Sequence, residues 1–321
     1  MRRPILAAVL VSLICLRPSI PAGAQESKLP APIGWIYLQA GSRTMVPGSG
    51  LLKGKPVQID QGSLVPVFNT KERGGAKQAL VRIFNLGTGS PEAGWVEVAP
   101  ADVLPPDAYP RDSDLLRQLG EPYLDDFTAA HTRVARFLVR QGQSPPILLC
   151  YVYAQPLPTA RLVAFTPSAG KFLPTASQDY SINDFKAGIT SMEIRDLLGD
   201  GIESFITREP FREGPDTTGT NLIIRRIEGN KFLTLWQAPV DFRNFSAFNS
   251  KIQILQPPEK NIGAPGTVTA GDVTFRTHGK GQEPVWKGKV EFFALGREKA
   301  VDSVSLEKVC PWDGNQFAPL R

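Results

Sequence analysis

The residues whose types and spacing most suggest chemistry lie in one acidic, glycine-rich stretch, residues 195–206, which reads RDLLGDGIESFI. Asp196 and Asp200 carry short carboxylates that can accept hydrogen bonds from the backbone N–H groups of a turn. Gly199 and Gly201 supply the positive φ that a tight turn often requires. Apolar residues follow from Ile202 onwards, so the stretch predicts a tight turn that leads directly into a strand.

This stretch resembles the calcium loops of integrin-type repeats (FG-GAP or VCBS repeats) in secreted β-propellers, whose pattern is Asp-x-Asx-x-Asp-Gly-x-x-Asp. The resemblance implies that Asp196 and Asp200 are side-chain ligands and that Ile202 provides a backbone carbonyl. Leu198 stands where a second side-chain ligand belongs, and Ser204 stands where the last carboxylate belongs. Because calcium takes about 6–8 oxygen ligands, both a structural calcium site and a metal-free turn held by its own aspartates remain open.

Other catalytic signatures are absent from the sequence. The only histidines are His131 and His278, and there is no Gly-x-Ser-x-Gly elbow, His-Glu-x-x-His motif, phosphate loop or dinucleotide fingerprint. The adjacent acids Asp125 and Asp126 would point apart on an extended chain. The sequence therefore predicts no enzymatic activity. The alternative is an envelope polysaccharide hydrolase whose carboxylates converge from separate loops.

The beginning of the chain has the pattern of a secretory signal. A positive end at Arg2 and Arg3 is followed by a short apolar run, and residues 22–24 read Ala-Gly-Ala, a small-x-small cleavage pattern. The run is shorter than the roughly 20 residues that a spanning helix needs. We therefore expect residues 1–24 to be a cleaved signal peptide, and the mature protein to be exported, periplasmic or extracellular, without a transmembrane segment.

The charge of the chain argues against a nucleic-acid partner. The formal net charge is +5, and residues 1–24 contain three arginines and no acid, so their removal leaves +2. No cluster of basic residues interleaved with aromatic residues stands out, and such a cluster is the usual footprint of nucleic-acid binding. A protein or cell-wall ligand is the partner that we expect.

Two of the three cysteines remain after the signal is removed, Cys150 and Cys310. Both lie in apolar runs typical of strands. An even pair in an exported protein is a candidate disulfide, because the bond persists outside the cytosol. Two separate buried thiols are the equally open alternative.

The first mature region, residues 35–103, has short β-like runs separated by turn residues. Residues 80–84 (LVRIF), a polar glycine-containing turn and then residues 94–96 (GWV) resemble the final hairpin of a bacterial SH3-like barrel. The resemblance implies a small barrel that binds its ligand through exposed aromatic residues. Trp35, Tyr37 and Phe68 are the candidates, although aromatic residues in so small a domain are often part of the core.

A proline-rich linker, residues 104–126, is expected to follow this barrel. Four prolines lie between residues 99 and 110, which disfavours a central strand and favours an extended chain. The apolar positions 115, 116 and 119 predict one short helix over residues 113–119.

The second region, residues 127–321, is expected to be a repeat-containing antiparallel β domain. A strand, a glycine turn and a strand that begins with phenylalanine recur at Phe172, Phe232 and Phe317. Residues 133–140 and 147–153 predict a further hairpin. Together with the loop at residues 195–206, this recurrence indicates an FG-GAP/VCBS-like, incomplete or small propeller-like domain. The predicted fold class is all-β.

These observations predict an exported, non-catalytic binding or scaffold protein of the cell envelope that recognises its ligand through loops. Its ligand and its oligomeric state are not encoded in any motif of the sequence. Calcium, if bound, would be structural.

Overall fold

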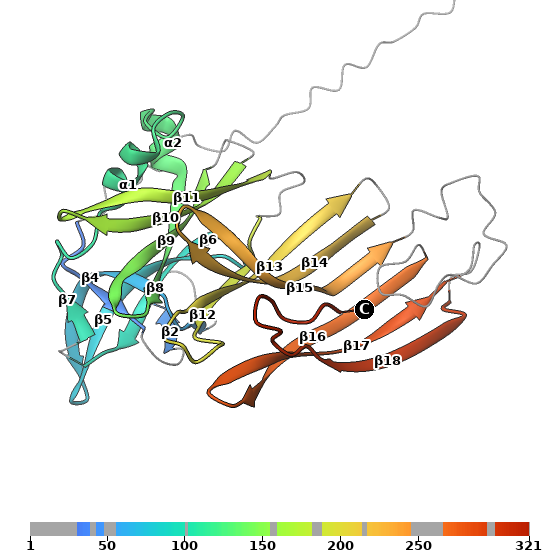
Figure 1. Ribbon diagram of the computed structural model, residues 1–321. Helices are drawn as coiled ribbons and strands as arrows, with labels where there is room; N and C mark the ends of the chain where they lie inside the picture. The colour runs from blue at the N-terminus through green and yellow to red at the C-terminus, as the bar shows by residue number, and fades with distance from the viewer. Residues whose placement is uncertain are drawn as a thin grey trace, which may run out of the picture. The chain divides into compact units, whose positions relative to one another are not determined.

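A computed structural model describes residues 31–38, 43–47, 56–99, 102–154, 159–181, 188–213, 217–244, 266–293 and 299–320. The expected signal peptide lies outside these residues. Strands dominate the described residues, so the predicted all-β fold class is confirmed (Figure 1). No helix among the described residues is both long and apolar enough to cross a bilayer.

The first sheet contains seven antiparallel strands in the order β3-β2-β6-β5-β4-β1-β7. The strands are β1 (Gly34–Tyr37), β2 (Arg43–Pro47), β3 (Val57–Ile59), β4 (Leu64–Arg73), β5 (Ala76–Asn85), β6 (Ser90–Glu97) and β7 (Val103–Leu104). Gly94 allows β2 and β6 to approach closely, because a Cβ atom there would lie 2.5 Å from the carbonyl oxygen of Val46. The described strands form an open sheet, so the closed SH3-like barrel that we predicted is not present in this part of the chain.

The middle sheet has four antiparallel strands in the order β11-β10-β9-β8. The strands are β8 (Thr132–Gln141), β9 (Ser144–Ala154), β10 (Thr159–Ser168) and β11 (Lys171–Ser181). The β8–β9 hairpin predicted from residues 133–140 and 147–153 is confirmed. Both faces of β8 and β9 are apolar because both are covered: Phe137 and Leu149 belong to one core, and Leu138 and Leu148 belong to another.

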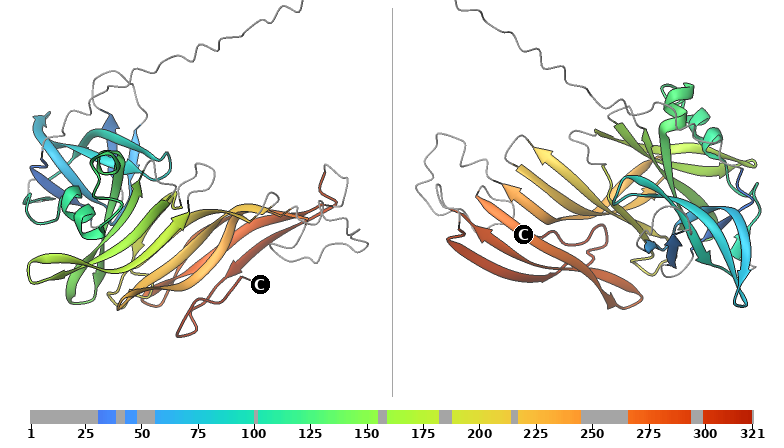
Figure 2. Two further views of the ribbon diagram at one scale, coloured as in Figure 1. Left: turned by 90° about the horizontal axis from the view of Figure 1, so that it is seen from above. Right: turned by 180° about the vertical axis from the view of Figure 1, so that it is seen from behind.

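The last sheet is a seven-stranded meander in strict chain order (Figure 2). It contains β12 (Ser191–Arg195), β13 (Ser204–Glu213), β14 (Thr217–Glu228), β15 (Lys231–Asn244), β16 (Thr267–His278), β17 (Gly281–Phe292) and β18 (Asp302–Val309). The chain after β18 returns over one face of this meander, where Phe317 is buried and its N–H donates to the carbonyl oxygen of Leu235 at 3.0 Å.

This order of strands corrects the propeller-like expectation. A propeller is built from separate blades of about four strands, whereas β12–β18 form one continuous sheet. Phe172 and Phe232 do hold equivalent places, because each is the second residue of the second strand of a hairpin. Phe317 does not, because it lies in the C-terminal segment and is bridged to Trp312. The threefold repeat is therefore wrong in its third copy.

Two short helices lie between the first two sheets in the sequence, α1 (Asp112–Leu119) and α2 (Asp126–His131). The short helix predicted over residues 113–119 is confirmed as α1. Leu115 and Leu116 of α1 share a core with Trp35 of β1 and with Leu138 and Val152 of the middle sheet. The first sheet, α1 and the middle sheet are thus held by one apolar cluster.

Candidate functional site

The acidic, glycine-rich loop links β12 to β13 and is held by its own aspartate. The carboxylate of Asp196 accepts hydrogen bonds from the N–H groups of Gly199, at 2.8 Å, and Gly201, at 2.9 Å. Gly199 has a φ of +68°, and a Cβ atom there would lie 2.2 Å from the carbonyl oxygen of Lys280. The loop therefore needs glycine at this position both for its backbone angle and for its close packing.

Three of the four predicted calcium ligands surround an arginine side chain. Arg226 of β14 donates to both carboxylate oxygens of Asp200, at 2.8 Å each, and to the carbonyl oxygen of Ile202, also at 2.8 Å. Its Nε donates to the hydroxyl of Ser204 at 3.2 Å. The fourth residue, Asp196, is directed to backbone N–H groups instead. A guanidinium thus provides the positive charge at this loop, and the arrangement does not fit a calcium ion, which would have to displace Arg226.

The electrostatics of this loop follow from the same contact. Hydrogen bonds from Arg226 lower the pKa of Asp200, although its partial burial opposes the shift. Because the folded-state pKa lies below the unfolded value of about 4, this contact stabilises the fold above that pH. The stabilisation is lost as the pH falls through the lowered pKa.

The loop also contacts two other parts of the chain. The carboxylate of Glu203 accepts hydrogen bonds from the backbone N–H of Arg140, at 2.7 Å, and from its Nε, at 3.0 Å. The N–H of Gln282, at the start of β17, donates to the carbonyl oxygen of Leu197 at 2.6 Å. The loop is therefore a junction between the middle sheet and the two hairpins of the meander that contain Arg226 and Gln282.

A calcium titration tests this description of the loop. We expect the unfolding temperature of the wild-type protein to be the same in millimolar calcium and in excess chelator, measured by differential scanning calorimetry. The matched control is Arg226→Ala, which leaves the oxygens of Asp200, Ile202 and Ser204 without their cationic partner and should destabilise the protein. A calcium-dependent rise of the unfolding temperature in the wild type would contradict the account.

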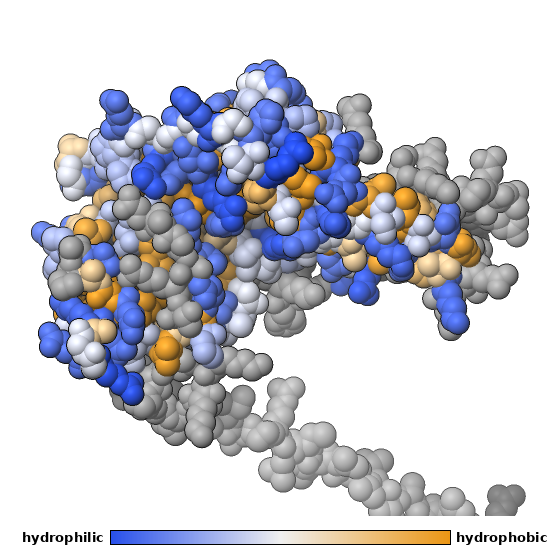
Figure 3. All heavy atoms as spheres, turned by 90° about the horizontal axis from the view of Figure 1, so that it is seen from below, coloured by the Kyte–Doolittle hydropathy of each residue, from blue (hydrophilic) through white to orange (hydrophobic). Residues whose placement is uncertain are grey.

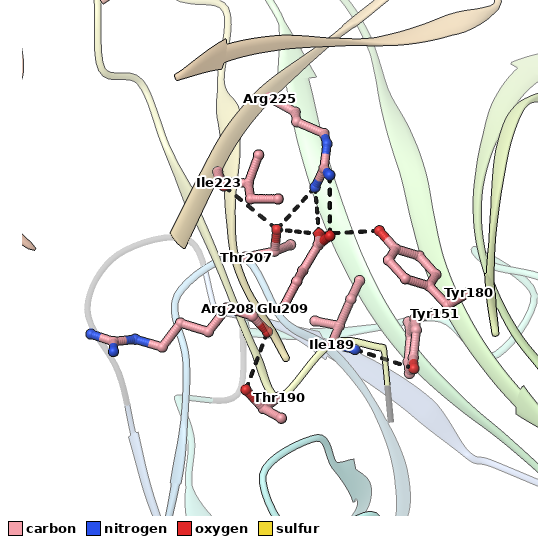
Figure 4. A network of polar contacts seen from close by, with 9 residues as sticks. All are labelled: Tyr151, Tyr180, Ile189, Thr190, Thr207, Arg208, Glu209, Ile223 and Arg225. Atoms are coloured by element: carbon pink, nitrogen blue, oxygen red, sulfur yellow. Dashed lines mark hydrogen bonds and ion pairs between the residues drawn. The ribbon is translucent and has the colours of Figure 1, made fainter. Parts of the chain in front are cut away.

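A second polar network is buried where β13, β14 and β11 meet, and Figure 4 shows its members. Arg225 forms an ion pair with Glu209, and its second terminal nitrogen donates to the same carboxylate at 3.2 Å. The hydroxyls of Thr207, at 2.6 Å, and Tyr180, at 3.1 Å, also donate to Glu209. Burial and the nearby carboxylate raise the pKa of Tyr180, which keeps its proton for this bond. The polar groups of this network hydrogen-bond to one another, so the network holds β11, β13 and β14 together.

The three aromatic residues that were predicted to contact a ligand differ in how deeply they are buried. Trp35 is 1% exposed, and its Nε1 donates to the carbonyl oxygen of Pro106 at 3.1 Å, so it is a core residue. Tyr37 is half-buried, and its pKa is raised by burial and then by the charge of Glu203. Phe68 is half-buried at a bulge where the register between β4 and β5 shifts. The structure thus places Trp35 in the core and leaves Tyr37 and Phe68 partly accessible.

The candidate disulfide is not formed. Cys150 and Cys310 are both free and fully buried, and they belong to different apolar cores. Burial raises the pKa of the Cys150 thiol to about 12. The two residues therefore act as small apolar side chains, the alternative that the sequence left open.

A groove of about 690 Å³ lies beside the proline-rich linker. Its walls come from the linker, from α1 and from the turn between β10 and β11: Pro106, Asp107, Ala108, Tyr109, Pro110, Arg111, Asp114, Arg117, Gln118, Gly170, Lys171, Phe172 and Leu173. The ring centres of Tyr109 and Phe172 lie 5.8 Å apart. The ring centres of Tyr109 and Trp35 lie 6.1 Å apart, and these two rings are nearly perpendicular. Typical ligand sites have volumes of about 300–1,000 Å³, so the groove is of suitable size.

Some charged side chains of this groove form ion pairs with each other, and others do not. Asp114 accepts the N–H of Arg111 at the start of α1 and lies 3.5 Å from Arg117. Lys171 is exposed at the turn between β10 and β11 and forms no ion pair with a described residue. Arg111 is also exposed and forms no ion pair with a described residue. The groove therefore offers two aromatic rings and the cations of Arg111 and Lys171 to a ligand. Sequence reasoning missed it because its walls come from segments some 60 residues apart.

Two other hollows occur in the described chain. One of about 890 Å³ lies against the first sheet, with Val46, Lys77 and Trp95 among its walls. The ring of Trp95 already has a cation partner there, because the amine of Lys71 lies 3.6 Å from its centre. A cavity of about 160 Å³ between the first sheet and β8 is smaller than most ligand sites. Burial raises the pKa of Asp60 in its wall, and the charge of Glu193 adds to the shift. No group of three or more His, Cys, Asp or Glu side chains suited to a metal ion occurs among the described residues. Figure 3 shows that apolar side chains on the face seen from below form separate patches among hydrophilic ones.

Comparison of the chain with models of known protein families, with curated proteins and with solved structures finds no match. The SH3-like and FG-GAP/VCBS-like resemblances therefore have no support from these comparisons.

Proposed function

We propose that the protein is an exported, non-catalytic binding or scaffold protein of the cell envelope that holds a protein or cell-wall ligand through its loops. The observation that carries this proposal is the groove beside the linker, where Tyr109, Lys171 and Phe172 face a space of ligand size. Export rests on the signal pattern of residues 1–24.

The chemistry of the groove favours a ligand that combines an apolar or ring-shaped part with a negative charge. The rings of Tyr109 and Phe172, tilted by 38° to each other, give two neighbouring apolar surfaces. Lys171 supplies a cation that can bind a carboxylate. Rigid β-strands and α1 position these groups while loops present them, which is the usual arrangement of binding sites. Short wall peptides and acidic protein segments both have this chemistry.

The groove supports binding over hydrolysis. A glycosidase needs two carboxyl groups on opposite sides of the bond that it cleaves, about 5–9.5 Å apart. The groove contains Asp107 and Asp114, and Asp114 is engaged in the first turn of α1 and with Arg117. A carboxylate held in this way by the backbone of α1 and by Arg117 is not directed at a bond of a ligand in the groove.

The hairpin repeat supplies a matched test of this proposal. Lys171 and Lys231 both begin the second strand of a hairpin, each is exposed, and each is followed by Phe and Leu, but only Lys171 lines the groove. We expect Lys171→Ala to weaken binding to purified peptidoglycan, or to a panel of acidic peptides, about threefold to tenfold, because one charge contact is lost. The measurement is co-sedimentation for the wall and fluorescence titration for the peptides.

Lys231→Ala should bind as the wild type does. Equal loss of binding in both variants would point to a general charge effect, and unchanged binding in both would remove the groove from the proposal. Tyr109→Phe retains the ring and is the conservative control for Tyr109→Ala, which should weaken binding more than Lys171→Ala does.

A further inference from the structure

The last strand of the meander, β18, has an edge that no described strand covers. β18 pairs with β17 on one side, and the sheet ends there in the described part of the chain (Figure 1). Most of its residues are exposed; Leu306 is 37% exposed and Val301, just before the strand, is 55% exposed. Exposed edge strands with apolar side chains are templates for pairing with another strand.

The register of β18 shows which backbone groups face outward. The N–H of Cys310 donates to the carbonyl oxygen of Pro284 at 2.9 Å, and the register continues in steps of two through Lys308–Trp286 and Leu306–Gly288. In an antiparallel pair, alternate residues direct both of their backbone groups to the same neighbour. Residues 302, 304, 306 and 308 therefore face β17, and residues 303, 305 and 307 direct their N–H and C=O groups to the open edge.

We propose that β18 pairs antiparallel with β18 of a second copy of this chain, about a twofold axis at Ser305. This register places Asp302 opposite the partner's Lys308 and Val304 opposite the partner's Leu306. Each of these pairs occurs twice, because the interface is symmetric. The strand is thus complementary to itself in both charge and apolar character.

Neighbouring registers lack this match. An axis at Val304 would place Asp302 opposite the partner's Leu306, and an axis at Leu306 would place Lys308 opposite the partner's Val304. Cross-strand pairs of opposite charge or of apolar residues each stabilise a sheet by a few tenths to about 1 kcal/mol. Charge therefore selects the axis at Ser305.

The packing of the meander supports the same partner. Residues 302, 304, 306 and 308 lie on the face that carries Trp286, Val290 and Phe292, and Val304 packs against that core. Leu306 lies opposite Gly288, which has no side chain to cover it. In the proposed pair, the partner's Val304 covers Leu306, and the apolar layer continues from one copy to the next.

Charge reversal tests the register. In sedimentation experiments on the full chain, we expect a concentration-dependent dimer. Asp302→Lys or Lys308→Asp alone should weaken dimerisation at least tenfold, because each places like charges opposite one another twice. The double variant with both changes should restore the dimer. Circular dichroism shows whether each variant has kept its fold.

Cross-linking supplies a second readout that does not depend on charge. Hydrogen-bonded antiparallel residues have Cα atoms about 5.5 Å apart, which is within disulfide reach. Ser305→Cys should therefore form a covalent dimer on oxidation, whereas Ser303→Cys, on the same face of the same strand, should not. A monomer at all concentrations, a dimer indifferent to the charge reversals, or equal cross-linking at both positions would overturn the proposal.

Discussion

Replacing Arg225 with alanine is expected to lower the free energy of unfolding by about 3–5 kcal/mol. Arg225 is 6% exposed and Glu209 is 9% exposed, so the substitution leaves a buried carboxylate without its cation. The hydroxyls of Thr207 and Tyr180 still donate to Glu209 but supply no charge. The measurement is urea unfolding followed by circular dichroism.

Arg208 provides a matched control on the same sheet. It precedes Glu209 in β13 and forms an ion pair with Asp272 at 2.7 Å, but the two side chains are 39% and 68% exposed. Exposed ion pairs contribute about 0–1 kcal/mol, so Arg208→Ala should change stability little. The double variant Arg225→Met, Glu209→Leu removes both buried charges and should be more stable than Arg225→Ala alone. Equal effects at Arg225 and Arg208 would contradict the role given to the buried network.

The second large loss of stability is expected when Trp35 is replaced with alanine. Its side chain is 1% exposed in the core shared by the first sheet, α1 and the middle sheet, and the guanidinium of Arg136 lies 5.2 Å from its ring centre. Trp35→Ala should therefore destabilise the protein by about 3–5 kcal/mol, measured by urea unfolding. Because Tyr109 packs against Trp35, the same change should loosen the wall of the groove.

Two further variants separate the contributions of this tryptophan. Trp35→Phe keeps an aromatic ring and loses the hydrogen bond to Pro106, which is worth about 1 kcal/mol. Phe68→Ala removes a half-buried ring at a bulge and should lower the free energy of unfolding less than Trp35→Ala does. A Trp35→Ala variant that was as stable as the wild type but had lost ligand binding would show instead that Trp35 contacts the ligand.

The strands and their turns could be predicted from the sequence because their signals are local. Apolar runs bounded by glycine identified the β8–β9 hairpin. The recurring Ala-Gly-Lys-Phe-Leu and Gly-Asn-Lys-Phe-Leu turns identified the hairpins at Phe172 and Phe232. The apolar spacing at positions 115, 116 and 119 identified α1. The all-β class followed from these elements.

The pairing of distant segments could not be predicted in the same way. The loop after β12 has the carboxylates of a cation site, but Arg226, which lies 26 residues after Asp200, gives no sign in the sequence that it binds them. Phe317 repeats the hairpin pattern in sequence, yet its segment folds back over the meander. Both Cys150 and Cys310 have strand-like surroundings, and only the packing places them in different cores.

Binding without cleavage is tested most directly by incubating the protein with purified peptidoglycan and a panel of acidic peptides, and by measuring retention and cleavage in the same samples. We expect the wild-type protein to retain at least one of these ligands and the Lys171→Ala variant to retain less of it. The chromatogram of the released fragments should equal that of the sample without protein. New fragments that accumulate in proportion to protein and time, and that persist in the Lys171→Ala variant, would contradict this expectation.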